Sequence, residues 1–384
     1  MFPRLAFSVC FAATSMFIAH SALAAPFKVK GTAGSILLAT PHPVGGFNQP
    51  WSMTFLPGEE LLVATKPGKL WLVKKSDKKF EVHNVPPTYA GGQGGLGDVV
   101  LHPDFEQNNL VYLNLVDSLD NGKSRGSIVV RGKLERGSNP RLIDVEKIWT
   151  QTPKLQGRGH FSHRLAFGPK GTVHEGKLFI TSGDRQALAP AQRWDMALGK
   201  IIRLNDDGSV PNDNPYQNKG SLAKSFWSTG HRNPLGIAFA PDNQLWSNEM
   251  GPAHGDELNI IEPGKNYGWP VVSEGDHYSG EEIPNHDTRP DFEAPKTAWV
   301  PSIAPSGLII YSGKKFPDWN GDALIGGLRG RALVRVDVKG KTAREAERFE
   351  WGKRIREVEQ GPNGNIWVLE DRSGGRLISL SPSN

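Results

Sequence analysis

Two residues near the middle of the chain have the types that general acid–base chemistry requires. His160 stands in a glycine-bracketed loop before the apolar stretch 164–167, and Asp184 follows a second apolar stretch, 178–181. The Gly-Pro-Lys-Gly turn between the stretches predicts a β-hairpin. A hairpin brings its flanking residues to one end, where the carboxylate could orient the imidazole as a general base. A surface-loop histidine and a turn aspartate fit this stretch equally well.

Two further loops carry polar groups that suit a flat, oxygen-rich ligand. The glycine run 91–97 contains Gln93 as its one hydrogen-bonding side chain, and its glycines allow close backbone approach. It lacks the Lys-Ser or Lys-Thr of a phosphate-binding loop. Arg232 and Asn233 stand before Pro234 and could present a guanidinium fork and an amide. An ordinary turn is the alternative interpretation of both loops.

Acidic and basic residues gather in two other regions. The loop 248–259 combines acids, backbone carbonyls and tight turns, which suit a hard cation such as Ca²⁺, although a solvated acidic turn also fits. Five basic residues lie near the C-terminal end: Arg329, Arg331, Lys353, Arg354 and Arg356. Arg354 and Arg356 share one face if a strand begins there, and could clamp carboxylates bidentately. Isolated charge runs more often lie in solvent.

The elements that must position these loops form a unit that recurs six times. Each unit has an apolar strand, a Pro/Gly turn and a second apolar strand, and the copies begin near residues 51, 98, 164, 236, 307 and 356. This repeat predicts an all-β, six-bladed β-propeller, with a sandwich or a two-domain β protein as the alternative.

Residues outside the repeats suggest how the ring is completed and furnished. Residues 27–29 or 36–38 could return to complete the last blade. The long inserts 206–225 and 273–299 are expected to build the face around the central channel.

The first 24 residues are typical of a secretory signal peptide. Arg4 precedes the apolar stretch 5–18, and a small-x-small cleavage site ends at Ala24. The apolar part is too short to span a bilayer. Cys10, the only cysteine, lies in this segment, so the mature chain is expected to lack thiolate and disulfide chemistry. Residues 25–384 are expected to form one domain, since closed all-β architectures of this length often do. Export without disulfides favours a bacterial periplasm.

The charge pattern excludes two classes of partner. The formal net charge of +5 comes from 45 basic and 40 acidic residues that are interspersed along the chain. Nucleic-acid and membrane-surface binding would call for a polybasic run, and the chain has none. A small anionic ligand remains compatible with the modest positive excess.

Together these motifs resemble those of the soluble PQQ-dependent aldose sugar dehydrogenases, relatives of soluble quinoprotein glucose dehydrogenase. The resemblance extends from Gly45 to Leu380 and rests on GQGGLGDVVLHPDF, GHFSHRLAF with SGDR, GKIIRLNDDGSVPNDNP, GHRNPLGIAF, GPAHGDELNIIEPGKNYGWP, PSIAPSGL and RIREVEQGPNG. It implies a six-bladed propeller with the quinone lying flat on the channel face and a Ca²⁺ beside it.

The resemblance also implies roles for individual residues. His160 would take the anomeric hydroxyl proton of an aldose while a hydride passes from C1 to the quinone C5. Asp184 would orient the imidazole of His160. Arg232 would polarise the quinone oxygen. The other implied cofactor ligands are Gln93, Asn233, Arg329, Arg354 and Arg356. The carbonyls of Gly251 and Pro252 would bind the catalytic Ca²⁺, and Glu257 with the Tyr267 carbonyl fits a second calcium position.

The same resemblance implies an aldonolactone product and an external electron acceptor, whose identity the sequence does not give. A monomer and a dimer are both compatible. Three positions depart from the family pattern. His163 replaces a small residue before Arg164 and could crowd the site, and the turn 173–176 is longer than expected. Glucose-specific relatives place an aromatic residue one position after Trp299, so the sugar cannot be carried over.

Two other functions fit the predicted fold. An exported propeller could bind a ligand without catalysis, but it would have no need for a base together with an anion clamp. A Ca²⁺-dependent lactonase would use metal-activated water and acidic ligands in the channel, and it would have no use for Arg354 and Arg356.

Overall fold

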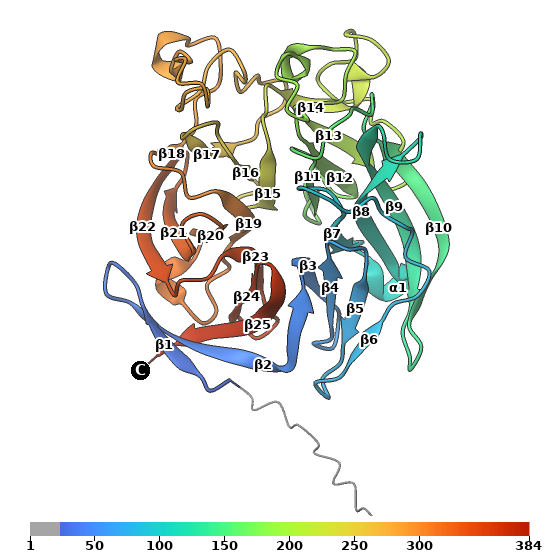
Figure 1. Cartoon of the computed structure of the whole chain (residues 1–384), viewed down its shortest axis with the longest axis vertical. Coiled ribbons are helices and arrows are strands. Elements are labelled where there is room, and N and C mark those ends of the chain that lie inside the picture. Colours follow the sequence, from blue (N-terminus) through green and yellow to red (C-terminus); the bar gives the residue numbers. More distant parts are fainter. Residues whose placement is uncertain (1–23, 384) are drawn as a thin grey trace, which may run out of the picture.

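The computed structural model describes residues 24–383. The predicted signal peptide, with Cys10, lies outside the described residues except for Ala24. The described residues form six β-sheets, which Figure 1 shows arranged as a ring and following one another in chain order. The predicted six-bladed propeller is therefore confirmed. Within residues 24–383, none of the helices has the length and apolar character needed to cross a membrane.

The first three blades come from the N-terminal half of the chain, and each is a four-stranded antiparallel sheet. Blade 1 contains β3 (Pro50–Phe55), β4 (Leu61–Thr65), β5 (Leu70–Val73) and β6 (Lys79–Glu81). Blade 2 contains β7 (Leu96–Leu101), β8 (Leu110–Ser118), β9 (Arg125–Glu135) and β10 (Arg141–Thr150). Blade 3 contains β11 (Ser162–Phe167), β12 (Lys177–Ser182), β13 (Lys200–Asn205) and β14 (Phe226–Thr229).

The other three blades follow from the C-terminal half. Blade 4 contains β15 (Pro234–Phe239), β16 (Leu245–Glu249), β17 (Asp256–Ile260) and β18 (Thr297–Trp299). Blade 5 contains β19 (Pro305–Ile310), β20 (Ala323–Gly327), β21 (Ala332–Lys339) and β22 (Thr342–Glu350). Blade 6 contains β23 (Ile355–Gln360), β24 (Ile366–Glu370), β25 (Ser373–Pro382), β2 (Ile36–Asn48) and β1 (Phe27–Lys30).

Helical segments are short. The α-helix α1 (Phe105–Asn108) connects β7 to β8, and 3₁₀ turns occupy Ala189–Gln192, Ala223–Ser225, His286–Thr288 and Pro317–Trp319. The turn after β3 uses Gly58 at φ 91°, and the turn after β15 uses Asn243 at φ 69°. Glycine and asparagine tolerate this left-handed conformation best, so the Pro-Gly and Pro-Asp-Asn sequences set these hairpins.

The ring closes through the N-terminal strands. β2 pairs with β25, for example through Leu38 and Ser381, and β1 pairs with β2, so both predicted segments join the last blade. In Figure 1 blue β2 lies beside red β25. Pairing the first strands with the last blade leaves no gap in the ring, and it joins the two ends of the chain by backbone hydrogen bonds.

Apolar side chains fill the spaces between neighbouring blades. Leu62 of blade 1 packs with Leu113 of blade 2, and Val129 of blade 2 packs with Ile180 of blade 3. Each sheet is thus covered on both faces, as stacked sheets require. The inner strands β3, β7, β11, β15, β19 and β23 contact one another around the axis. The N-terminal ends of these six strands all lie at the same face of the propeller, and this face carries the candidate site.

One long insert does not lie where the sequence analysis placed it. β13 runs from Lys200, which pairs with Ser182, to Asn205, which pairs with Lys177. Because Ser182 pairs with Ser162 at the His160 end, the insert 206–225 leaves blade 3 at the opposite end. Successive antiparallel strands alternate in direction, so connections after the third strand begin away from the channel face. In blade 4, residues beyond Gly264 return to the His160 end, where the Trp269 N–H bonds the Gly230 carbonyl.

Candidate active site

The predicted hairpin places a histidine and an aspartate side by side. β11 and β12 pair from Ser162 with Ser182 to Phe167 with Leu178. At the open end, His160 Nδ1 lies 2.6 Å from Asp184 Oδ1, with both side chains buried. Since an ionised carboxylate only accepts hydrogen bonds, Nδ1 carries the proton and leaves Nε2 with a free lone pair.

Two further donors hold the carboxylate of Asp184. The indole Nε1 of Trp269 donates to Oδ2 at 2.8 Å, and the backbone N–H of Gln186 donates to Oδ1 at 2.8 Å. Trp269 belongs to the connection between β17 and β18, so blade 4 fixes the orientation of a blade 3 side chain. The sequence analysis missed this partner because nothing local links positions 85 residues apart.

The electrostatics of the pair favour a neutral imidazole beside an ionised carboxylate. Burial lowers the pKa of His160, and the nearby Arg232 adds to that shift, which outweighs the opposing effect of Asp184. Burial alone would raise the pKa of Asp184, but the bonds from His160 and Trp269 bring it below its usual value. Desolvation thus keeps the imidazole in its proton-accepting form at neutral pH.

Arg232 lies next to this pair. Its carbonyl accepts the backbone N–H of Asp184 at 2.9 Å, and its own N–H donates to Glu249 Oε2 at 2.6 Å. The guanidinium donates to the Met250 carbonyl at 3.0 Å and lies 5.2 Å from the centre of the Trp269 ring. The side chain is 6% exposed, which makes it a largely desolvated positive charge close to His160.

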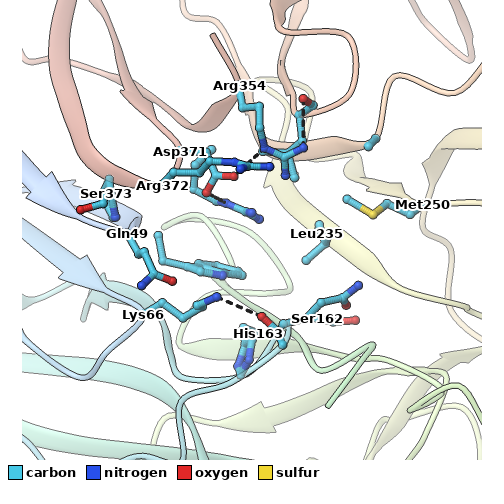
Figure 2. A pocket seen from close by; sticks show the side chains of 17 residues that line it. Gln49, Lys66, Ser162, His163, Leu235, Met250, Arg354, Asp371, Arg372 and Ser373 are labelled. Carbon is cyan, nitrogen blue, oxygen red and sulfur yellow. Dashed lines mark hydrogen bonds and ion pairs between the residues drawn. The ribbon is translucent and has the colours of Figure 1, made fainter. Parts of the chain in front are cut away.

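A cavity of about 560 Å³ opens at this face of the propeller, at the entrance to the channel. The wall of the cavity includes Gln93 and Ser162, which lie next to His160, and Met250, whose carbonyl accepts a hydrogen bond from Arg232. Figure 2 shows Arg354, Arg372 and Asp371 on one side of the cavity and Lys66 and His163 on the other. Its basic lining residues are Lys66, Arg354, Arg356 and Arg372.

Asp371 lies between the two arginines that were predicted to form an anion clamp. Arg354 Nε is 2.7 Å from Oδ2 and Arg356 Nε is 3.2 Å from Oδ1. Burial by itself would raise the pKa of Asp371, but the neighbouring Arg356 and Arg354 outweigh this effect and bring the pKa below its usual value. The carboxylate is therefore ionised. The cavity lining therefore contains four basic side chains and one carboxylate, which leaves an excess of positive charge.

Lys66 is a cavity residue that the sequence analysis did not single out. It follows β4 directly, and its Nζ donates to the Gly92 carbonyl at 3.0 Å. Burial and the neighbouring Arg356 lower its pKa, while Asp371 opposes them. Its position directly after β4, at the same end of blade 1 as the start of β3, was the signal that could have identified it.

Gln93 and Asn233 come together at the cavity wall. Gln93 Oε1 accepts the backbone N–H of His160 at 2.8 Å and the Asn233 amide at 3.4 Å. Ser162 Oγ donates to Asn233 Oδ1 at 3.3 Å. The side chain of Arg329 is exposed in the turn after β20, where its backbone N–H bonds the Ile303 carbonyl, and it does not line the cavity.

His163, the residue that departs from the family pattern, has a different environment from His160. It is 1% exposed, and its Nδ1 lies 2.8 Å from Asn114 Oδ1. The ring stacks on Phe161 and meets Trp51 edge-on, with centroids 5.5 and 5.4 Å apart. Burial lowers the pKa of His163 to about 3, so it is a far weaker base than an ordinary histidine.

Residues 47–379 match the model of the glucose/sorbosone dehydrogenase family. The chain belongs to this family. Aldose sugar dehydrogenase YliI from Escherichia coli K12 is 39% identical over 345 residues, which cover 88% of this chain and 91% of that protein. Quinoprotein glucose dehydrogenase B from Acinetobacter calcoaceticus is 27% identical over 420 residues, covering 88% and 84%.

Solved structures agree with this assignment. The apo-form of the soluble aldose sugar dehydrogenase from Escherichia coli superposes with a TM-score of 0.83 at 35% identity, covering 90% of this chain and all of that one. The PQQ-bound aldose sugar dehydrogenase from Streptomyces coelicolor gives a TM-score of 0.74 at 26% identity, covering 92% and 99%. The predicted family and the enzyme class of the chain, a sugar dehydrogenase, are confirmed.

Gly251 and Pro252, whose carbonyls were predicted to bind Ca²⁺, lie in the turn between β16 and β17. The Gly251 N–H bonds Asp256 Oδ1 at 3.0 Å, which fixes the turn. Within residues 24–383, the carbonyl oxygens of Gly251 and Pro252 accept no protein hydrogen bond. Nor do three or more His, Asp or Glu side chains of those residues form a group able to hold a metal.

A second acidic region lies behind this turn, in blade 4. Glu257 of β17 pairs across the sheet with Glu249 of β16, and both are buried. Burial, followed by repulsion from Glu249, raises the pKa of Glu257 well above its usual value. The Tyr267 carbonyl lies 3.2 Å from His286 Nε2, whose Nδ1 is 3.0 Å from Glu274. Burial and neighbouring negative charge therefore both disfavour the ionised form of Glu257.

Proposed function

We propose that the protein oxidises aldose sugars at C1 to aldonolactones, with PQQ as its cofactor and Ca²⁺ beside it. The observation that carries this proposal is the neutral imidazole of His160, oriented by Asp184, beside a cavity lined by four basic side chains. The names of the relatives support the substrate class, and the PQQ-bound relative supports the cofactor.

The cavity suits a flat tricarboxylate such as PQQ. Lys66, Arg354, Arg356 and Arg372 would face its carboxylates, and Asp371 holds the guanidiniums of Arg354 and Arg356 in place by accepting a hydrogen bond from each. Trp51 and Leu235 add apolar lining suited to the ring system. Gln93 and Asn233 supply amide groups close to His160. When bound, the cofactor supplies the hydride acceptor that protein side chains lack.

His160 then serves as the general base. Nε2 takes the proton of the anomeric hydroxyl as C1 loses a hydride, and the C1–O bond becomes the lactone carbonyl. Asp184 holds the tautomer with the proton on Nδ1 and stabilises the imidazolium that forms. Arg232, whose positive charge is largely buried, would stabilise negative charge on the bound cofactor.

The carbonyls of Gly251 and Pro252 would hold the catalytic Ca²⁺, because they are oxygen ligands without protein partners in residues 24–383. Glu257, with the Tyr267 carbonyl, would hold a second Ca²⁺. Arg329 is exposed in the neighbouring turn, and it would reach the cofactor only from the rim.

Reconstitution tests the proposed function. Purified apoprotein should oxidise aldoses in a dye-linked assay only when both PQQ and Ca²⁺ are present. His160→Ala should keep PQQ affinity and lose turnover. His163→Ala, the matched histidine in the same strand region, should retain turnover. Tight PQQ binding without oxidation of any sugar in a broad panel would refute the enzymatic function, and an inactive His163→Ala with an active His160→Ala would refute the base assignment.

We further propose that the chain is exported to the periplasm, with cleavage after Ala24, and passes its electrons to an external acceptor. The composition of residues 1–24 supports export. N-terminal sequencing of the periplasmic fraction tests the cleavage site, and a protein that keeps Met1 in the cytoplasm would contradict it.

A further inference from the structure

Tyr278 is the most exposed aromatic side chain in the described part of the chain. It lies in the connection between β17 and β18 and is 77% exposed, whereas Tyr89, the next, is 37% exposed. A tyrosine ring offers a large apolar area that a ligand could cover, and this ring stands beside the candidate site, as its contact with Arg232 shows.

The ring lies against a residue of the active site. The Arg232 guanidinium carbon is 5.8 Å from the centre of the Tyr278 ring, and Nη2 is 3.5 Å from the tyrosine hydroxyl. On its other side the guanidinium is 5.2 Å from the Trp269 ring, and Trp269 bonds Asp184. One connection of blade 4 thus supplies both the aromatic ring that orients the catalytic pair and the exposed ring beyond Arg232.

The two aromatic residues differ in a way that separates their roles. Trp269 is 5% exposed and its N–H is used inside the protein. Tyr278 covers Arg232 with one part of its ring, while most of its surface faces solvent. The contact with Arg232 explains the position of one part of the Tyr278 ring. The exposed part of the ring remains available to a ligand. The site therefore has an apolar platform beside its charged groups.

We propose that Tyr278 is a substrate-binding residue on which the pyranose ring of the sugar stacks. This rests on the proposed function and deepens it by assigning the substrate's ring form. A pyranose has faces of C–H groups and a rim of hydroxyls, so it matches an aromatic ring flanked by a hydrogen-bonding guanidinium. Pyranoses with only equatorial hydroxyls expose the most continuous C–H face and should be preferred.

The test compares Tyr278→Ala and Tyr278→Phe with Val173→Ala in the PQQ- and Ca²⁺-loaded enzyme. Val173 is 81% exposed in the turn between β11 and β12, at the end of blade 3 remote from His160. We expect Tyr278→Ala to raise KM for D-glucose about tenfold with little change in kcat or PQQ affinity. Its preference for D-glucose over D-galactose, which has one axial hydroxyl, should fall. Val173→Ala should behave as wild type, and Tyr278→Phe, which keeps the ring but loses the hydroxyl near Arg232, should retain most of the affinity for D-glucose.

Two results would overturn the proposal. One is an unchanged KM in Tyr278→Ala. The other is a loss of kcat and PQQ affinity without a KM effect, which would show that the ring only supports Arg232. Saturation-transfer NMR of D-glucose on the apoprotein supplies a readout that does not depend on turnover. If wild-type enzyme oxidises no sugar, the proposed function fails. The NMR signal, lost in Tyr278→Ala or retained, then decides the role of Tyr278 independently.

Discussion

Replacing Asp184 by Asn removes the charge that faces His160 while keeping the shape of the side chain. Asp184 accepts three hydrogen bonds, from His160 Nδ1 at 2.6 Å, Gln186 N at 2.8 Å and Trp269 Nε1 at 2.8 Å. An asparagine has one acceptor oxygen and one NH₂ group. Either orientation of the amide therefore places the NH₂ group against at least one former donor.

The two orientations have different consequences. If the amide oxygen faces His160, the NH₂ group faces the Trp269 N–H, and a buried donor without an acceptor costs about 1–3 kcal/mol of stability. If the amide turns over, its NH₂ group donates to His160 Nδ1, and the imidazole proton moves to Nε2. The lone pair that should take the substrate proton is then absent.

Both orientations also remove the carboxylate that stabilises the imidazolium. The corresponding change in a Ser-His-Asp triad lowers kcat by about 10⁴. We therefore expect Asp184→Asn to lower kcat by about 10²–10⁴, which corresponds to about 3–5 kcal/mol of transition-state stabilisation. PQQ affinity should change little, because Asp184 does not line the cavity.

The measurements are kcat and KM for an aldose at saturating PQQ, PQQ affinity by titration, and the thermal midpoint. Asp195→Asn is the matched control, since Asp195 also follows β12 but is exposed and pairs with Arg193. A kcat within fivefold of wild type would refute the role of Asp184. Equal losses of PQQ affinity and activity would show that the substitution damages the cavity instead.

Three other substitutions test the remaining parts of the site. Lys66→Gln should weaken PQQ binding about tenfold, because a charge-assisted bond is lost, and unchanged affinity in a fluorescence titration would contradict its role. Glu257→Gln should reduce the rise in thermal midpoint that saturating Ca²⁺ produces, and an undiminished rise would exclude Glu257 as a ligand. The pKa of His163 is about 3 when folded, against 6.5 for a free histidine, so the unfolded state binds the extra proton between these values. The contribution of His163 to the free energy of unfolding is therefore fully present above pH 6.5. Up to about 5 kcal/mol of the free energy of unfolding is lost as the pH falls to 3. Chemical denaturation should show His163→Gln to be less acid-sensitive than wild type, and equal sensitivity would contradict the assignment.

The strand pattern was readable because it depends on short-range physics. Alternating apolar residues and Pro/Gly turns define each hairpin within about 20 residues, and His160 and Asp184 stand at the two ends of one such hairpin. Their pairing therefore followed from local sequence. The same holds for the adjacent Arg232 and Asn233, whose position at the start of β15 places them at the channel end.

Other features of the site depend on more than local sequence. The insert 206–225 was placed at the wrong end of blade 3, because its direction depends on how many strands precede it in the sheet. The environment of His163 depends on Asn114 of the neighbouring blade, which no spacing within the hairpin indicates. The charge pair of Arg354 and Arg356 was visible, whereas Asp371 between them was not.

The amino-acid sequence by itself determined the six-bladed fold, the channel-end position of His160 and Asp184, and the family. Only the tertiary structure decided which distant groups complete the site. Ring closure brings Lys66 of blade 1 and Asp371 of blade 6 to one cavity, and it brings Trp269 and Tyr278 of blade 4 to the His160 region. These contacts depend on how the blades pack around the axis, because burial and charge act through space and not along the chain.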